Sequence, residues 1–138
     1  MRSSAPQEQN EFVVYVTDQL RRWAPVSARQ LFGGHGIYRG EKIFGIVSRD
    51  TLYFRTDDIN RPEFTSAGMS PFRVGKAGRI ALSYHEVPAD VIEESELLAK
   101  WADSAFAAAM RRDKAQTKSR KRGPGNRPAR RPLKQRKG

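Results

Sequence analysis

The spacing of hydrophobic residues changes sharply near residue 25. Before it, Phe12, Val16, Leu20 and Trp23 recur at intervals of three and four residues, a pattern typical of an amphipathic helix with one buried face. We therefore expect a helix over residues 8–24. Pro25 should end it, because proline has no amide hydrogen to donate and its ring clashes with the preceding turn.

Residues 26–56 carry short runs of β-branched and aromatic residues separated by turn residues. The pattern predicts strands over 26–32, 43–48 and 51–56, joined by short connections as an antiparallel meander. Gly45 within the second strand indicates a bulge or a close backbone approach. Three glycines in four positions, Gly33-Gly34-His35-Gly36, lie between the first two strands. Since glycine reaches positive φ without steric cost, we expect this segment to turn or kink the chain and to allow close packing. A contact with a ligand or partner is the alternative.

The second half of the chain repeats the change from helix to sheet and back. A short helix is expected over residues 57–67, with Asn60 as its N-cap and Gly68 in the left-handed position after its end. Two strands follow, over 71–74 and 79–87. Helical stretches begin near Pro88 and Ser95. The order α-β-β-β-α-β-β-α predicts an α+β fold with two layers, an antiparallel sheet and helices on one face.

Charge is distributed very unevenly along the chain. Residues 114–138 hold 11 of the 26 Lys and Arg residues and no acid, which leaves 15 bases against 15 acids in residues 1–113. The tail also contains almost no large apolar side chain, so it cannot offset the entropy of ordering. We therefore expect a domain over residues 1–113 and a disordered basic tail over 114–138.

The tail is the strongest candidate for a binding function, because arginine pairs well with phosphate and such contacts are independent of sequence. The residues predicted to bind nucleic acid share a positive charge and a place in the tail: Lys118, Arg120, Lys121, Arg122, Arg127, Arg130, Arg131, Lys134, Arg136 and Lys137. An acidic protein is the alternative partner. A tail that only raises solubility is a further alternative.

A second basic site is conceivable on the sheet itself. Arg29, Arg55 and Arg73 lie on expected strands beside aromatic residues, among them Tyr38, Tyr53 and Phe72. Such a set could form a platform like those of strand-based RNA binders. We favour the simpler interpretation, in which the arginines occupy the solvent side of a one-sided sheet, because the charge of residues 1–113 is balanced.

Catalysis finds little support in the residues. The chain has no cysteine, which excludes thiol chemistry and disulfides. His35 and His85 are its two histidines, and their spacing is not that of a metal site. Ser48 and Ser83 lack the context of an activated nucleophile. We expect no catalytic residue, no metal and no cofactor, and therefore a protein that is not an enzyme.

Neither end of the chain suggests insertion into a membrane. No apolar run approaches the roughly 18 residues that a spanning helix needs, and the first residues lack the apolar stretch of a secretory signal. A cytoplasmic protein is the expectation.

Several stretches together resemble one known family. They are Arg29-Gln30-Leu31-Phe32-Gly33-Gly34-His35-Gly36-Ile37-Tyr38, Leu52-Tyr53-Phe54-Arg55-Thr56-Asp57 and Ser83-Tyr84-His85-Glu86-Val87-Pro88, with Asn60, Phe64, Gly68 and Pro71-Phe72 between them. The chain resembles the TfoX N-terminal domain family over roughly residues 8–112. Leu31 stands where the family usually has methionine, and His85 where a second aromatic is common. Full-length members carry a helical C-terminal domain, whose place the basic tail takes here.

The resemblance implies a two-layer fold similar to that of type III secretion chaperones, and a link to transcription regulation, as in bacterial competence development. With the tail, it predicts a non-enzymatic regulatory or adaptor protein that associates with nucleic acid nonspecifically. The alternative is a protein-interaction module, which binds a partner or a second copy through an exposed sheet face or edge and for which the tail is incidental.

Overall fold

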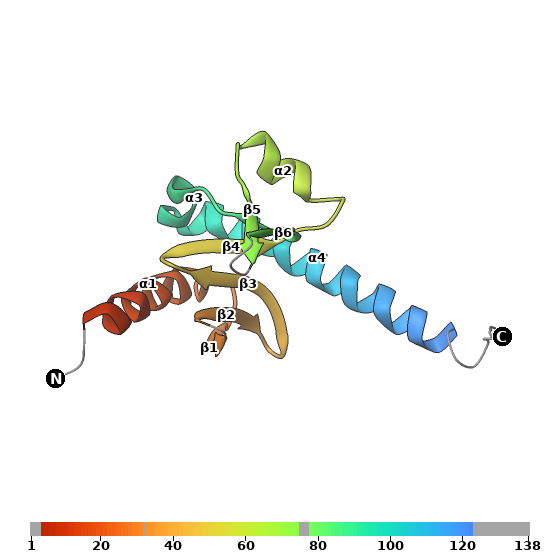
Figure 1. Cartoon of the computed structure of the whole chain (residues 1–138), viewed down its shortest axis with the longest axis horizontal. Helices are drawn as coiled ribbons and strands as arrows, with labels where there is room; N and C mark the ends of the chain where they lie inside the picture. Colours follow the sequence, from red (N-terminus) through yellow and green to blue (C-terminus); the bar gives the residue numbers. More distant parts are fainter. Residues whose placement is uncertain (1–3, 32, 75–77, 123–138) are drawn as a thin grey trace.

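Figure 1 shows a sheet crossed by one long helix. The computed structural model describes residues 4–31, 33–74 and 78–122, with side chains for those between 11 and 115. The elements in this part of the chain are, in order, α1 (Ser4–Leu20), β1 (Ser27–Leu31), β2 (Gly34–Arg39), β3 (Lys42–Ser48), β4 (Thr51–Arg55), α2 (Arg61–Ser66), β5 (Pro71–Val74), β6 (Arg79–Glu86), α3 (Ala89–Glu93) and α4 (Ser95–Arg122).

The strands form one antiparallel sheet with the order β1-β2-β3-β4-β6-β5. The predicted α+β class is therefore confirmed, and the elements follow the predicted order. The glycine segment was expected to link two strands, but most of it is itself a strand, β2, which adds to the meander. Strands are predicted from the alternation of apolar and polar side chains, and glycine contributes no side chain to that pattern. The glycines of β2 therefore prevented its prediction as a strand.

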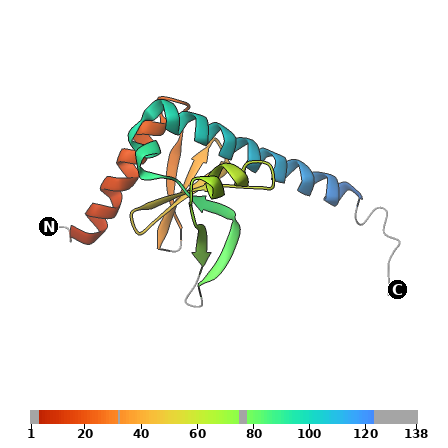
Figure 2. The ribbon, with the colours of Figure 1, turned by 90° about the horizontal axis from the view of Figure 1, so that it is seen from above.

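The helices and one face of the sheet share a single core. Val16 and Leu20 of α1, Phe64 of α2 and Leu98 and Ala105 of α4 are fully buried. Together with α3 they pack in one cluster with the inward side chains of the strands, which include Ile37, Phe44, Leu52 and Phe54. Figure 2 shows α1 and α4 lying along the same side of the sheet. Helices on one face were expected, and this arrangement leaves the other face uncovered by any described helix.

Two local predictions about glycine are confirmed. Gly45 was expected at a bulge or close approach. It pairs with Ile37 while Ile43 pairs with Tyr38, so Phe44 is the extra residue of a bulge. Gly68 has a φ of 79° and follows α2 in the left-handed conformation that ends many helices.

Asn60 does occupy the N-cap position of α2, although its side chain makes no capping bond there. Instead its amide nitrogen donates to the Arg55 carbonyl at 3.0 Å and to Ser104 Oγ at 3.0 Å. Asp57 closes the turn that leads into the helix, because its Oδ1 accepts hydrogen bonds from the amides of Ile59 and Asn60. Asn60 therefore ties the end of β4 to α4.

The long helix α4 continues to Arg122, into the segment that the sequence predicts to be disordered. For residues 114–122 that prediction is corrected by the structure. The prediction considered only that this segment has almost no large apolar side chains to bury. Lysine, arginine, alanine and glutamine are good helix formers, and extending an existing helix avoids the cost of nucleation. The rest of the predicted tail, residues 123–138, lies outside the described residues, and the domain boundary at residue 113 stays a prediction.

Candidate nucleic-acid interface

The uncovered face of the sheet, called the open face below, is lined by large side chains. Side chains alternate across a strand, so the neighbours of the core residues point away from the helices. The aromatic and aliphatic residues of this face are half-buried because they shield one another: Leu31, Tyr38, Ile43, Ile46, Tyr53 and Phe72. The rings of Tyr53 on β4 and Phe72 on β5 lie 4.7 Å apart between centroids.

Two arginines lie across tyrosine rings on the open face. The guanidinium of Arg29 is 4.4 Å from the ring centroid of Tyr38. The guanidinium of Arg55 is 5.1 Å from the ring centroid of Tyr84, and its Nη1 donates a hydrogen bond to the Tyr84 hydroxyl at 3.3 Å. A planar guanidinium over an aromatic ring is a favourable cation–π contact. Of the conceived platform, Arg29 thus contacts Tyr38 as proposed, while Arg55 stacks on Tyr84 rather than on one of the three aromatic residues named for it.

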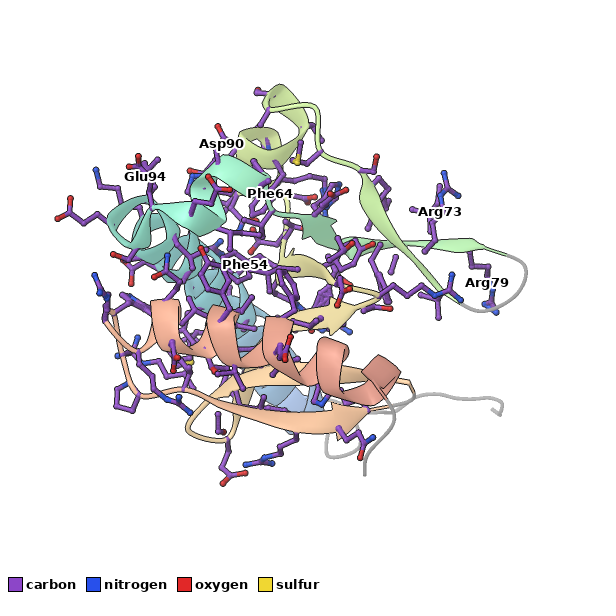
Figure 3. The ribbon with its side chains drawn as sticks, turned by 90° about the vertical axis from the view of Figure 1, so that its left-hand side faces the viewer. Phe54, Phe64, Arg73, Arg79, Asp90 and Glu94 are labelled. Carbon is purple, nitrogen blue, oxygen red and sulfur yellow. The ribbon has the colours of Figure 1, made fainter. Side chains whose placement is uncertain are left out.

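The third arginine is placed differently. Arg73 lies on β5, and its Nη1 donates to the carbonyl of Gly78 across the β5–β6 hairpin at 3.1 Å. Figure 3 shows it on that hairpin, with Arg79 on the strand opposite. The sequence had favoured solvent-facing arginines over a platform. The geometry satisfies both interpretations for Arg29 and Arg55, because the solvent side of the sheet is also its aromatic side.

A hollow of about 940 Å³ lies on the open face. Its apolar lining comes from Leu31, Ile46, Tyr53 and Phe72, and Arg49 also borders it. Burial, and to a lesser extent the nearby Glu86 carboxylate, raises the pKa of Tyr53 above its usual 10.0. The phenol therefore stays protonated at neutral pH and keeps a hydrogen to donate.

The glycine segment forms one end of this hollow, and its geometry is that of close strand packing. Gly33 turns the chain with a φ of 81°. A Cβ on Gly34 would lie 2.5 Å from the Val47 carbonyl oxygen, and one on Gly36 would lie 2.8 Å from Leu31 Cδ1. The predicted turn and close approach are confirmed. A phosphate loop presents its amides at a helix N-terminus, whereas the segment here continues as a strand.

A second, smaller basic site lies where α4 passes the loop after β4. Arg111 of α4 donates from Nε and Nη2 to the carboxylate of Asp57 at 2.6 and 2.9 Å. These bonds hold the pKa of Asp57 below its usual range. Asp57 and Arg111 are 54 residues apart, so no local pattern could have revealed the pair. Arg55 and Arg112 line the same cleft of about 300 Å³, and no described carboxylate lies within ion-pair distance of either.

The predicted nucleic-acid-binding residues fall into two groups. Four of them lie on the last turns of α4, where the structure gives the backbone but not the side chains: Lys118, Arg120, Lys121 and Arg122. The other six lie outside the described residues: Arg127, Arg130, Arg131, Lys134, Arg136 and Lys137. The base of this helical segment is anchored on the domain through the Arg111–Asp57 pair and through Lys42 on Asp113.

The two histidines do not approach each other in the sheet. His35 is on β2 and His85 on β6, with β3 and β4 between them. His85 is buried and its Nδ1 lies 3.0 Å from Thr56 Oγ1. Thr56 Oγ1 donates its hydrogen to the Leu82 carbonyl, so His85 must donate from Nδ1. Among residues 4–31, 33–74 and 78–122, no cluster of three or more potential metal-ligating side chains occurs.

Taken together, the fold defines a small two-layer α+β domain with one open, arginine-bearing face. The family model of the TfoX N-terminal domain matches residues 18–109, and the chain belongs to this family. It is a regulatory-type domain family rather than a known enzyme family. None of the curated proteins matches the chain at a significant level. No described helix is long and apolar enough to cross a bilayer.

Proposed function

We propose that this protein is a non-enzymatic regulatory or adaptor protein, linked to transcription, that associates with nucleic acid nonspecifically through residues 114–138. The observation that carries the proposal is the separation of charge: these residues hold 11 bases and no acid, while the rest of the chain is formally neutral. Phosphates neutralised by such a segment release counterions, which drives binding without regard to sequence.

The fold supports this role because α4 leads away from the sheet. Its last buried residue is Ala109, and beyond it the helix extends past the other elements, as Figures 1 and 2 show. The Arg111–Asp57 and Lys42–Asp113 ion pairs hold the base of this arm. The arm therefore places the first tail bases clear of the domain, where a long polyanion can reach them.

The test measures the affinity of the full chain for a labelled DNA duplex over a salt series. If about five tail bases contact phosphates, the log–log slope should be near −4 to −5. A tail-neutral variant replaces the ten predicted tail residues by glutamine, which keeps the chain length and the helix propensity. It should lose most of the affinity and of the slope. An affinity that salt does not change, or that the variant retains, would contradict the proposal.

A protein-interaction module is the second candidate, and the uncovered sheet edges favour it. Strands β1 and β5 are the outermost strands of the sheet, and such edges can pair with another chain. This function predicts a complex that survives nuclease and high salt. Sedimentation of the purified chain over a range of concentrations would detect pairing with a second copy.

A further inference from the structure

We propose that the open face of the sheet is a second binding site, which takes unpaired bases of single-stranded nucleic acid. This goes beyond the proposed function, because the tail contacts phosphates and cannot distinguish single strands from duplexes. The site is formed by the hollow, which the Tyr53–Phe72 ring pair lines, and by the two arginine–tyrosine stacks elsewhere on the same face.

The first argument is the surface that the face offers. Every base has an apolar π-face, and single-strand binders stack it on aromatic rings or on guanidinium planes. The open face provides both kinds of surface. Tyr53 and Phe72 line the hollow, and the guanidinium of Arg29 is fixed over Tyr38 and within 3.4 Å of Glu41. The contact with Tyr38 orients the guanidinium plane, so stacking a base on it costs less further entropy than stacking on an uncontacted arginine.

The second argument is charge. Arg29, Arg49 and Arg55 lie on or beside the open face, and Arg49 is close enough to Tyr53 to lower its pKa against the effect of burial. No described carboxylate lies within ion-pair distance of Arg49 or Arg55. The acids nearby are Glu41, which pairs with Arg29, Asp50 in the β3–β4 turn, and Glu86 on β6. Arg73 also lines the hollow, so four arginines lie on or beside the open face against these three acids. A phosphate backbone complements this excess of positive charge.

The same charges argue against a second copy of this chain as the occupant. A two-fold interface pairs a surface patch with the same patch of the other copy, so two faces that each carry an excess of arginine would meet. A polyanion meets no such repulsion. The apolar hollow alone would suit a protein segment, but Arg49 and Arg73 in its lining and the stacked guanidiniums elsewhere on the open face favour a ligand with both rings and phosphates.

The third argument is continuity with the basic arm. Arg55 lies on the ring of Tyr84 at the open face and also lines the cleft beside α4, together with Arg111 and Arg112. A strand held by the arm therefore meets Arg112 and Arg55 next, and Arg55 lies two residues along β4 from Tyr53, which lines the hollow. A duplex could bind the arm, but its bases are stacked inside and could not enter the hollow.

The experiment separates the two sites with two variants and two probes, all in the full-length chain. The probes are a labelled oligothymidylate and a DNA duplex of equal length. Phe72→Ala should weaken binding of the single strand by roughly 5- to 100-fold, as expected for the loss of one or two stacked bases, and leave duplex binding unchanged. Arg49→Gln should also weaken binding of the single strand, and it removes a charge rather than an apolar contact.

Matched controls lie on α1 and in the turn directly after it, away from the open face. Tyr15→Ala removes an exposed aromatic ring and Arg21→Gln an exposed arginine, and both should leave single-strand binding unchanged. The tail-neutral variant should lose duplex binding but keep the part of single-strand binding that depends on Phe72. If that variant binds duplex as well as the native chain does, the proposed function fails while this inference stands.

The inference is overturned if Phe72→Ala and Arg49→Gln weaken both probes equally, or neither. It is also overturned if Phe72→Ala dissociates a dimer of the chain and leaves single-strand binding unchanged, which would assign the open face to a second copy.

Discussion

The two faces of the sheet are made by alternate residues of the same strands and yet differ in almost every property. On the face covered by helices, Phe44, Leu52 and Phe54 are fully buried. On the open face, their neighbours Ile43, Tyr53 and Arg55 are half-buried and are shielded by one another or by arginines. Both faces are rich in aromatic residues, so hydrophobicity alone does not tell them apart.

The difference lies in what covers each face. Helices seal the first, and there each ring contributes its full hydrophobic free energy to stability. The open face is left with aromatic area that the described fold does not bury, which is a common mark of an interaction surface. We therefore expect substitutions on the covered face to unfold the protein, and those on the open face to alter binding.

The largest expected effect compares two phenylalanines on opposite faces. Phe54→Ala removes a fully buried ring that packs against Phe44, with centroids 5.8 Å apart. It should lower the free energy of unfolding by about 3–5 kcal/mol. Phe72→Ala removes a half-exposed ring from β5 and should cost only about 1 kcal/mol. Urea denaturation of both variants measures the difference.

Because the residue type is the same and both are strand residues, the loss of β-propensity cancels in this comparison. Equal losses of stability would show that Phe72 also belongs to the core. In that case the open face could not be treated as a surface kept free for binding.

The sequence predicted the two faces only in part. Runs of β-branched and aromatic residues within 43–48 and 51–56 were enough to predict the strands, because such runs are local, but they did not say which residues face the helices. Gly68 and Gly45 were predicted correctly because a left-handed turn and a bulge need few other residues. The side-chain contacts of Asn60 and the Asp57–Arg111 pair depend on α4, far along the chain, and no local rule contains them.

The residues of the open face could be named from the sequence, but their role could not be predicted. Arg29, Arg55 and the tyrosines could be read as a platform or as a plain solvent face. The decision between them depends on the register that puts Arg29 near Tyr38 and Arg55 opposite Tyr84. The helical course of residues 114–122 was missed for another reason, since helix propagation from a packed helix requires no burial of its own.

The next largest effect tests whether the close packing of β2 requires glycine at positions 34 and 36. Gly34→Ala would place a Cβ 2.5 Å from the Val47 carbonyl oxygen, which is backbone and cannot move without shifting β3. We expect a loss of about 2–3 kcal/mol, at the upper end of overpacking costs. Gly36→Ala meets the ends of Leu31, Ile43 and Tyr38 at 2.8–2.9 Å.

Those side chains can turn aside, so Gly36→Ala should cost about 1 kcal/mol and change the open face rather than the strand pairing. Thermal unfolding of the two variants measures both losses. If Gly34→Ala lost less stability than Gly36→Ala, the close approach of β2 to β3 would not explain the glycine at position 34.

The smallest expected effect concerns a titrating group on the covered face. His85 lies opposite Phe54 in the sheet and is buried. Burial first, and then the charge of Arg61, lower its pKa below the usual 6.5. The folded state therefore disfavours the protonated ring, whereas the unfolded chain binds a proton normally. Stability should be complete above about pH 6.5 and should fall as the pH drops below that value.

His85→Gln removes this ionisation and should flatten the dependence of the unfolding free energy on pH below about 6.5, whatever it costs in absolute stability. His35→Gln, on the half-exposed strand β2, is the matched control and should keep the slope of the native chain. Urea unfolding at several pH values provides the measurement. A slope that persists in His85→Gln would mean that another group causes it, and that folding does not lower the pKa of His85 enough to affect stability.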